Sequence, residues 1–327
     1  MYPMKFSTVY IEKPWGGRTL EKFKGKLPDG LIGETWDISA QEQGISKITN
    51  GPLAGQGLDK VVENSGAALL GRNVTTDFFP LMVRHVSSRE NLSVQVHPTR
   101  EYAIANGQHS GKDEAWYVLE AEPGAFVYAG VDPSTTEEEF RAAVLDQTVR
   151  DHLIKLPVRA GDCLFIPAGM IHAICAGVTL IEICENSNTT YRVYDYGRNR
   201  GLDIQETFAN MDLSCLTTVR RGLARTEDGA SETTICIQPT MAMAIHEVSS
   251  EQQIETAGES FHALTCLRGS GRILWSDDEA PLAIERGESV LIPACIENYM
   301  VEGELDFMRS WIPDPSARER LVAQSVA

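Results

Sequence analysis

The sequence predicts a mainly β protein built from two related β-sandwich or barrel units, with a helical insertion in the first unit and a degenerate second unit. Three observations carry this prediction. Short runs rich in β-branched and aromatic residues recur along the chain, for example FPLMVRHV, NLSVQVHP, AWYVLEA and SVLIPA. Gly, Pro or Asn separates these runs at close spacing, as in sandwiches and small barrels. The third observation is an internal repeat.

The repeat joins the middle of the chain to its C-terminal part. The segment VRAGDCLFIPAGMIHAICAG (158–177) aligns without gaps on IERGESVLIPACIENYMVEG (284–303), at a constant offset of 126 residues. Upstream, EAWYVLEAEPG (114–124) pairs with HALTCLRGSG (262–271) at an offset of 148. The difference, 148 − 126 = 22 residues, is about the size of a helical segment at 134–156. That segment is therefore predicted to be an insertion in the first copy.

The repeat also suggests domain boundaries. We expect a first unit at residues 1–219, a polar linker at 220–234 and a second unit at 235–327. Within the insertion at 134–156, Thr136 and Glu139 form a capping box ahead of an apolar helix face. The remaining helical patterns lie at 57–71, at 99–107 and in the tail SARERLVAQSV.

Composition excludes several classes of function. The 327 residues contain no apolar run near the roughly 18 that a membrane span needs, and the N-terminal residues lack the pattern of an export signal, so we expect a cytoplasmic protein. The seven cysteines include no CxxC pair, which argues against a disulfide framework or a thiolate zinc site. A net charge of −17 argues against nucleic acid or an anionic membrane as a partner.

Four residues have the spacing of metal ligands. Gln95 and His97 stand two apart in a predicted strand, so both side chains project to the face that Ser93 shares. Glu114 lies at the start of a second strand. The pattern Gly161-x5-Pro167-x-Gly169-x2-His172 delivers His172 to a third, and it resembles the second motif of the cupins. Three strands therefore offer the ligands Gln95, His97, Glu114 and His172.

A single histidine in an apolar strand is more often a core residue than a ligand, but here the joint pattern favours a metal. One anionic ligand leaves a divalent cation with positive charge and an open position, which suits a Lewis acid. We expect one zinc ion per chain, in the first unit. The ligands alone do not exclude other divalent metals.

Several motifs of the chain resemble those of a known family. VYIEKPWGG, LIGETWDISA, LSVQVHP, GKDEAWYVLEAEPGA, LFIPAGMIHAI and NTTYRVYDYGR are similar, in the same order, to motifs of short bacterial type I phosphomannose isomerases. Residues 240–312 resemble the second, degenerate cupin of that family more loosely. The resemblance implies a zinc-dependent aldose–ketose isomerase that interconverts mannose 6-phosphate and fructose 6-phosphate through an enediol, with a catalytic cupin at 1–219.

The resemblance also implies roles for individual residues. Arg192 falls where the family has its catalytic arginine, and Lys112 falls where the family has a pocket lysine. Ser93 and Arg84 match positions that look onto the pocket, although lysine is more usual at the position of Arg84. Asn188 stands where the family commonly has an acid, and an amide cannot act as a carboxylate base. The proton would then move on Lys112, on a zinc-bound hydroxide or on another group.

Elementary chemistry assigns Arg192 to the developing oxyanion or a substrate hydroxyl, because a guanidinium does not readily release a proton. An acidic protein needs local positive charge to hold a phosphate, and Arg84, Lys112 and Arg100 are the candidates. In the second copy Glu114 is replaced by His262 and His172 by Asn298, so a complete ligand set is expected only in the first.

Two other functions remain open at this stage. A cupin dioxygenase would bind iron and typically has a second histidine at the position of Gln95. A non-catalytic cupin that binds a sugar phosphate would turn nothing over, and Asn188 favours that alternative. In each case the expected partner is a small molecule, and the chain could be a monomer or a homodimer.

Overall fold

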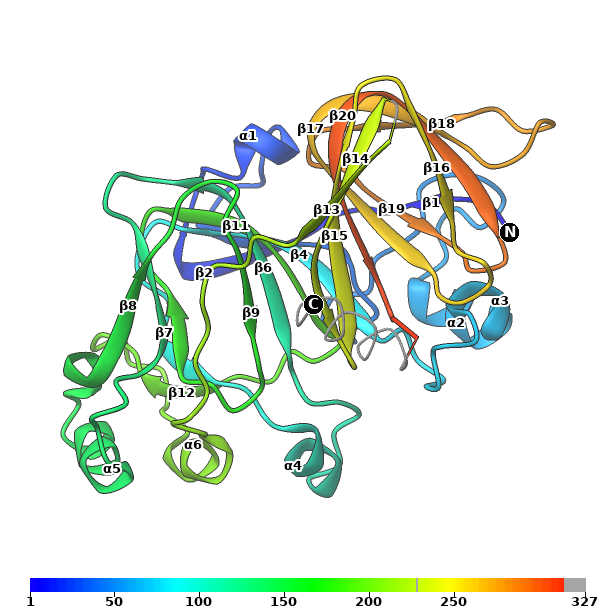
Figure 1. Ribbon diagram of the computed structural model, residues 1–327. Coiled ribbons are helices and arrows are strands. Elements are labelled where there is room, and N and C mark those ends of the chain that lie inside the picture. The colour runs from blue at the N-terminus through cyan, green and yellow to red at the C-terminus, as the bar shows by residue number, and fades with distance from the viewer. Residues whose placement is uncertain (228, 315–327) are drawn as a thin grey trace, which may run out of the picture.

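The computed structural model describes residues 1–227 and 229–314, and it confirms a mainly β protein with two β units (Figure 1). The first unit contains two facing sheets. All pairings within them are antiparallel. The larger sheet has six strands in the order β2 (Val9–Gly17), β3 (Ile32–Ile38), β4 (Leu81–Ser88), β11 (Val178–Glu185), β6 (Glu114–Ala121) and β9 (Cys163–Ile166).

The smaller sheet of the first unit holds two of the expected ligands. Its strands run in the order β12 (Tyr191–Tyr194), β5 (Val94–Val96), β10 (His172–Ile174), β7 (Phe126–Val131) and β8 (Leu153–Pro157). Trp116, Leu164 and Ile174 are among the buried residues that form the core between the sheets. In β5, Val94 and Val96 are buried in a separate core, and the side chain of Gln95 between them projects to the opposite face.

The second unit is a nine-stranded sheet with its own apolar core, which includes Leu264, Val290 and Phe307. Its main path runs β1 (Met4–Lys5), β19 (Ser289–Ile292), β17 (His262–Leu274), β20 (Asn298–Trp311), β15 (Met241–Val248), β14 (Ala230–Gln238) and β13 (Leu223–Glu227). Two further strands pair beside it, β16 (Glu251–Glu255) with β20 and β18 (Leu282–Glu285) with β17.

The internal repeat is visible in the pairing of these strands. In the first unit Glu114 of β6 lies opposite Ile166 of β9, and in the second His262 of β17 lies opposite Ile292 of β19. The offsets are 148 and 126 residues, those of the sequence alignment. The repeat therefore reflects one strand pairing used twice.

Helices cover the ends of the units, with α4 (Arg100–Ala105), α5 (Glu137–Leu145) and α6 (Ile204–Asn210) at one end of the first and α2 (Leu58–Ser65) and α3 (Ala67–Leu70) beside the second (Figure 1). The pattern at 57–71 forms two helices because Gly66 interrupts it at φ 47°. The helix expected at 99–107 spans Arg100–Ala105. In chain order the helices are α1 (Glu21–Lys24), α2 (Leu58–Ser65), α3 (Ala67–Leu70), α4 (Arg100–Ala105), α5 (Glu137–Leu145), the 3-10 turn η1 (Val149–His152) and α6 (Ile204–Asn210).

The helical prediction for 134–156 is right for its first half and wrong for its second. The capping box of Thr136 and Glu139 is present, and the helix ends at Leu145. Gln147 adopts φ 61°, a left-handed conformation that an α-helix cannot contain. Residues 153–157 then form β8, where Leu153 is buried and pairs with Val131 of β7.

The predicted linker at 220–234 lies largely in strands. Leu223–Glu227 and Ala230–Gln238 form the antiparallel pair β13 and β14, in which β-branched Thr233 and Thr234 suit a strand better than a flexible connection. At the other end of the chain, β1 pairs with β19, so residues 4–5 belong to the sheet of the second unit. The domain division at 219 and 235 stays a prediction, and the expected tail helix lies outside the described residues.

A shared apolar core joins the two units. The outer face of the six-stranded sheet contributes residues such as Val83 and Ile181, and the second unit contributes Met243 and Met308. Because this core backs β4, β6 and β11, the second unit supports the strands that carry Arg84, Glu114 and Glu182.

Candidate metal centre and active site

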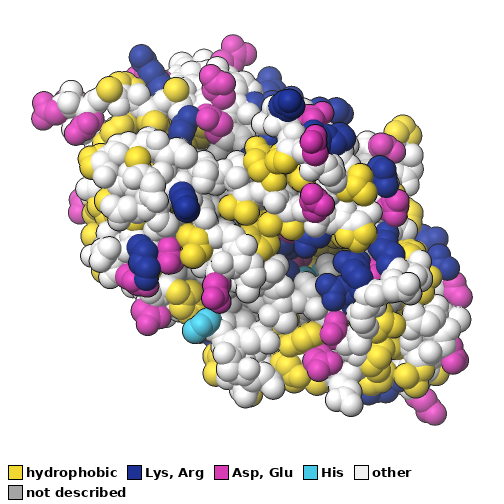
Figure 2. Space-filling model, turned by 180° about the vertical axis from the view of Figure 1, so that it is seen from behind, with side chains coloured by type: hydrophobic (Ala, Val, Ile, Leu, Met, Phe, Trp, Pro, Cys, Tyr) yellow, Lys and Arg dark blue, Asp and Glu magenta, His cyan; other side chains and the backbone are white. Residues whose placement is uncertain are grey.

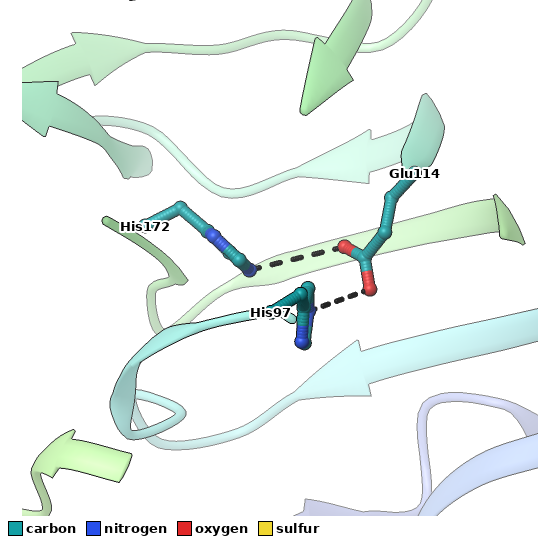
Figure 3. A group of neighbouring side chains, drawn as sticks. All are labelled: His97, Glu114 and His172. Atoms are coloured by element: carbon teal, nitrogen blue, oxygen red, sulfur yellow. Dashed lines mark ion pairs between the residues drawn. The ribbon is translucent and has the colours of Figure 1, made fainter. Parts of the chain in front are cut away.

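Three of the four predicted ligands meet inside the first unit. His97 directly follows β5, Glu114 opens β6 and His172 opens β10. Their ligand atoms lie within 4.8 Å of one another, and all three side chains are buried (Figure 3). The turn before His172 contains Gly169 at φ 86°, a conformation that glycine adopts at little cost. Residues 17 to 75 positions apart in the sequence are thus brought to one point.

The two imidazoles turn the same nitrogen toward Glu114. His97 Nδ1 lies 3.1 Å from the Thr189 carbonyl oxygen, and His172 Nδ1 lies 2.8 Å from that of Met170. A carbonyl only accepts, so each Nδ1 carries the proton and each Nε2 presents a lone pair. Burial lowers the pKa of His97 to about 3 and lowers that of His172, which keeps both rings neutral.

These lone pairs face a carboxylate. His97 Nε2 lies 2.8 Å from Glu114 Oε1, and His172 Nε2 lies 3.9 Å from Oε2. Burial acts to raise the pKa of Glu114, but the Lys112 ammonium beside it holds that pKa well below its usual value, so the group is ionised. Three acceptors that converge without a proton between them fit a divalent cation with nitrogen and oxygen ligands. The Trp116 indole donates to Glu114 Oε2 at 2.9 Å and orients the carboxylate.

Gln95 lies beside this cluster. It pairs with His172 across β5 and β10, and its Nε2 is 3.4 Å from His172 Nε2. The two ends of an amide are assigned from their surroundings, and turning the group over directs Oε1 to the same point. Gln95 can therefore complete the ligand set with an amide oxygen.

Lys112 is buried inside the same cluster. Its side chain is 1% exposed, and Nζ lies 3.1 Å from Glu114 Oε1 and 3.4 Å from His97 Nε2. Among the described residues Glu114 Oε1 has no partner with hydrogen-bond geometry, so the ammonium is an ion-pair neighbour of that oxygen. Lys112 touches the groups that would bind the metal, and it is not a solvated residue at a strand edge.

A cavity of about 130 Å³ opens next to the cluster. Four predicted residues, Arg84, Ser93, Asn188 and Arg192, line it together with Gln95. On one face of the molecule, Lys and Arg side chains gather around a hollow, as an anionic ligand of an acidic protein requires (Figure 2). Sequence reasoning assigned no role in the site to the other polar residues of the wall, which are Lys13, Glu34, Glu182, Thr190 and Arg200.

Arg84 is engaged by carboxylates. Its Nε donates to Glu182 at 2.7 Å, Nη1 lies 3.2 Å from Glu34, and Nη2 lies 3.6 Å from Glu114. Burial acts to raise the pKa of Glu34, but Arg84 and Lys13 lower it to about 2. With its donors occupied and its side chain 8% exposed, Arg84 is poorly placed to hold a phosphate.

Glu182 is the second buried carboxylate in the cavity wall. Burial raises its pKa, Glu114 adds to that effect, and Arg84 opposes it. A signal for Glu34 and Glu182 was present in the runs LIGETWDISA and VTLIEICE, where a charged residue sits inside an apolar strand. Such a residue is buried only with a partner, so it is a candidate for a functional site.

Arg192 supplies a less engaged cation. Its Nη1 is 3.9 Å from Asp203 Oδ2, and its buried Nε has no partner among the described residues. Arg200 also lines the cavity and pairs with Asp195, to which its Nε donates at 2.7 Å and its Nη2 at 2.5 Å. Arg100, by contrast, is half exposed, lies 3.8 Å from Glu185 and lines a different cavity.

The second unit has different side chains at the corresponding positions. His262 occupies the place of Glu114, and its Nδ1 lies 2.9 Å from the Tyr299 hydroxyl. Asn298 takes the place of His172. Within the described parts of the chain, His97, Glu114 and His172 form the one group of three or more histidine, cysteine or acidic residues arranged to hold a metal.

Comparisons with known proteins identify the family of the chain. Residues 4–142 match the family described as phosphomannose isomerase type I, catalytic domain, and residues 231–312 match mannose-6-phosphate isomerase, cupin domain. The chain is 30% identical to a mannose-6-phosphate isomerase of Streptococcus mutans, over 94% of this chain and 98% of the relative. It is also 30% identical to a probable mannose-6-phosphate isomerase, GmuF, of Bacillus subtilis, over 94% and 99%.

Solved structures match over nearly the whole chain. The mannose 6-phosphate isomerase from Bacillus subtilis superposes with a TM-score of 0.88 at 27% identity and covers 95% of this chain and 99% of its own. A variant of the phosphomannose isomerase from Salmonella typhimurium, at 17% identity and a TM-score of 0.75, shares the fold. The chain therefore belongs to the type I phosphomannose isomerase family.

Proposed function

We propose that this protein interconverts mannose 6-phosphate and fructose 6-phosphate through an enediol intermediate, with one zinc ion bound by Gln95, His97, Glu114 and His172. The observation that carries the proposal is the buried cluster of two neutral imidazoles and one carboxylate beside a cavity lined by arginines. We further propose that the protein acts in the cytoplasm as a monomer or homodimer. Among the described residues, no helix is long and apolar enough to cross a membrane.

The chemistry of the ligand atoms supports zinc. Two imidazole nitrogens, one carboxylate and one amide oxygen suit Zn²⁺, and a single anionic ligand leaves net positive charge at the site. When bound, the metal would polarise a substrate oxygen and stabilise negative charge on it. The protein contributes the geometry, because Thr189, Met170 and Trp116 fix the orientation of three ligands.

Isomerisation needs a group that removes a proton from the carbon beside a carbonyl and returns it to the neighbouring carbon. Asn188 lines the cavity but offers no carboxylate. Glu182 does, and burial raises its pKa, which brings a carboxyl group closer to the range where a base works at neutral pH. We assign proton transfer to Glu182, with Lys112 as an acid at the substrate oxygen.

Two further cations of the cavity wall suit the other parts of the substrate. Arg192 can donate hydrogen bonds to the oxygen that gains charge in the enediolate, since its side chain lines the cavity, is 32% exposed and lies 3.9 Å from its nearest carboxylate. The phosphate would lie toward Arg200, with Ser93 as a donor in the same wall. Arg200 pairs with Asp195 but is 28% exposed, against 8% for Arg84. This placement differs from the expectation that Arg84, Lys112 and Arg100 hold the phosphate. Two of these are buried against carboxylates, and the third lines another cavity.

A coupled assay tests the proposal. Metal-loaded protein should convert mannose 6-phosphate to fructose 6-phosphate, a chelator should abolish the conversion, and zinc should restore it. Binding without turnover by the metal-loaded protein would favour the non-catalytic alternative, for which Asn188 is the supporting residue. Product formed in deuterated water should carry deuterium at the carbon that exchanges its proton, as an enediol mechanism requires.

A further inference from the structure

The turn at residues 167–170 contacts the segments that carry the two histidine ligands. The Gly169 N–H donates to the backbone carbonyl of His97 at 3.1 Å. The Met170 carbonyl accepts from Nδ1 of His172 at 2.8 Å. Both contacts use backbone groups of the turn, which therefore holds the two histidine segments at a fixed separation.

The same turn reaches the strand of the carboxylate ligand through a side chain. The Ala168 N–H donates to Asp113 Oδ1 at 2.8 Å, and Asp113 directly precedes Glu114, the first residue of β6. Glu185 fixes the backbone of Asp113, because it accepts from the Asp113 N–H at 3.0 Å and donates its own N–H to the Asp113 carbonyl at 3.1 Å. Asp113 therefore ties the segment of the carboxylate ligand to the turn that holds both histidine segments.

The second unit binds the other oxygen of this carboxylate. Thr240 lies in the connection between β14 and β15, and its hydroxyl donates to Asp113 Oδ2 at 2.8 Å. Asp113 thus accepts one hydrogen bond from each unit, on separate oxygens. A hydroxyl of the unit without a complete ligand set therefore holds a residue next to a ligand of the other unit.

We propose that Asp113 is a positioning residue for the metal site, and that the second unit strengthens zinc binding through the Thr240 hydroxyl. The inference rests on the proposed metal site. Hydrogen bonds behind the ligands orient them, and the residues that supply those bonds affect metal affinity. If Asp113 is loosened, the Glu114 segment can move relative to the two histidines. A site whose ligands must first be drawn together binds its metal more weakly than a preformed one.

The test is the zinc affinity of the full-length protein, measured by competition with a chromophoric chelator, with the thermal unfolding of each variant recorded alongside. Thr240→Val keeps the shape of the side chain but removes the hydroxyl. We expect it to weaken zinc binding about three- to tenfold, the effect of one lost hydrogen bond. Thr240→Ser keeps the hydroxyl, so its zinc affinity should stay within about twofold of the wild type.

Thr256→Val is the matched control within the second unit. Thr256 is buried, and its hydroxyl is a donor to the backbone carbonyls of Ala294 and Ile296, at 2.8 Å and 2.9 Å. Its loss should lower the unfolding temperature at least as much as Thr240→Val does, and it should leave the zinc affinity unchanged. Equal weakening of zinc binding by the two variants would assign the effect to general destabilisation and overturn the proposal.

Variants of Asp113 separate the hydrogen bonds from the charge. Asp113→Ala removes both bonds and should weaken zinc binding by about 10- to 100-fold. Asp113→Asn keeps an oxygen for the Ala168 N–H and gains an amide donor for the Thr240 oxygen, so its zinc affinity should stay within about threefold of the wild type. If Asp113→Asn weakens binding as much as Asp113→Ala, the charge and not the positioning is responsible, and the proposal is wrong.

The wild-type protein distinguishes this inference from the proposed function. Wild-type protein that binds no zinc would contradict the proposed metal site and this inference with it. Zinc-binding wild-type protein, together with full zinc affinity in Thr240→Val or in Asp113→Ala, would overturn this inference alone.

Discussion

The two β units share a strand pairing and differ in what their side chains do. At one register position the first unit has Glu114 and the second has His262, and each lies opposite an isoleucine. Glu182 of the first unit lies opposite Trp116, and Arg309 lies opposite Leu264, at the corresponding place in the second. The same backbone positions thus hold a carboxylate in the first unit and a histidine or arginine in the second, so the fold alone does not confer the site.

In the second unit, interior histidines pack against aromatic side chains. His262 contacts Tyr299 and Trp311, and the ring of His246 stacks on Phe307 with centroids 4.6 Å apart. Its outer face packs against the strands that hold the metal cluster. The second unit therefore has no complete ligand set among its described residues, but it still packs against the strands of the unit that has one.

The largest expected effect comes from the ligand position itself. Glu114→Gln removes the anionic ligand, so the protein should bind zinc far more weakly, and kcat/KM should fall by roughly a thousandfold or more. His262→Gln at the corresponding place in the second unit should keep the metal and most of the activity. Metal content and coupled-assay rates of both variants provide the comparison, and equal losses would contradict the distinction between the units.

The second effect concerns proton transfer. Glu182→Gln keeps the shape of the side chain but removes the base, so kcat should fall by about 10²- to 10⁴-fold with metal content unchanged. Arg309→Gln at the corresponding position should leave kcat within a few-fold. If Glu182→Gln retains full kcat, another group carries the proton.

Acid should weaken the second unit through its histidines. Burial lowers the pKa of His246 to about 3, so the ring is neutral in the fold and takes up a proton on unfolding below its ordinary pKa of 6.5. Above about pH 6.5 the ring therefore does not lower the free energy of unfolding. As the pH falls from 6.5 toward 3, the unfolded chain binds a proton that the folded protein does not, and the free energy of unfolding drops, by about 2 kcal/mol at pH 5. Urea unfolding at pH 7 and pH 5 should show a smaller difference for His246→Gln than for the wild type. An unchanged difference would assign the acid sensitivity to other groups.

The smallest effect is expected at Asn188. If Glu182 carries the proton, Asn188→Asp adds a carboxylate that the reaction does not need, and kcat should change by less than about threefold. The coupled assay measures it. A large gain in rate would mean that the protein works without an acid that this position normally supplies.

Much of this arrangement was predictable from local sequence. The punctuated β runs, the repeat and the spacing of His97, Glu114 and His172 depend on neighbours within a strand or turn, which sequence patterns report well. The helix at 134–156 was overextended, because the break at Gln147 depends on a single left-handed residue. The pairing of β1 with β19 was missed because it joins residues more than 280 positions apart.

The carboxylates of the cavity show a second limit. Glu34, Arg84 and Glu182 lie on three adjacent strands that are far apart in sequence, so nothing local indicates that they meet. For the same reason Arg84 was expected to face a phosphate, whereas it is occupied by Glu34 and Glu182. Which cations remain available depends on pairing across the sheet.

The central claim is that a single metal site, in the first unit, serves the reaction. Anomalous diffraction at the zinc edge from crystals of the active protein tests it most directly. We predict one zinc peak per chain, among Gln95, His97, Glu114 and His172, and none within the second unit. An active protein whose zinc peak lies elsewhere, or whose second unit also binds the metal, would contradict the account.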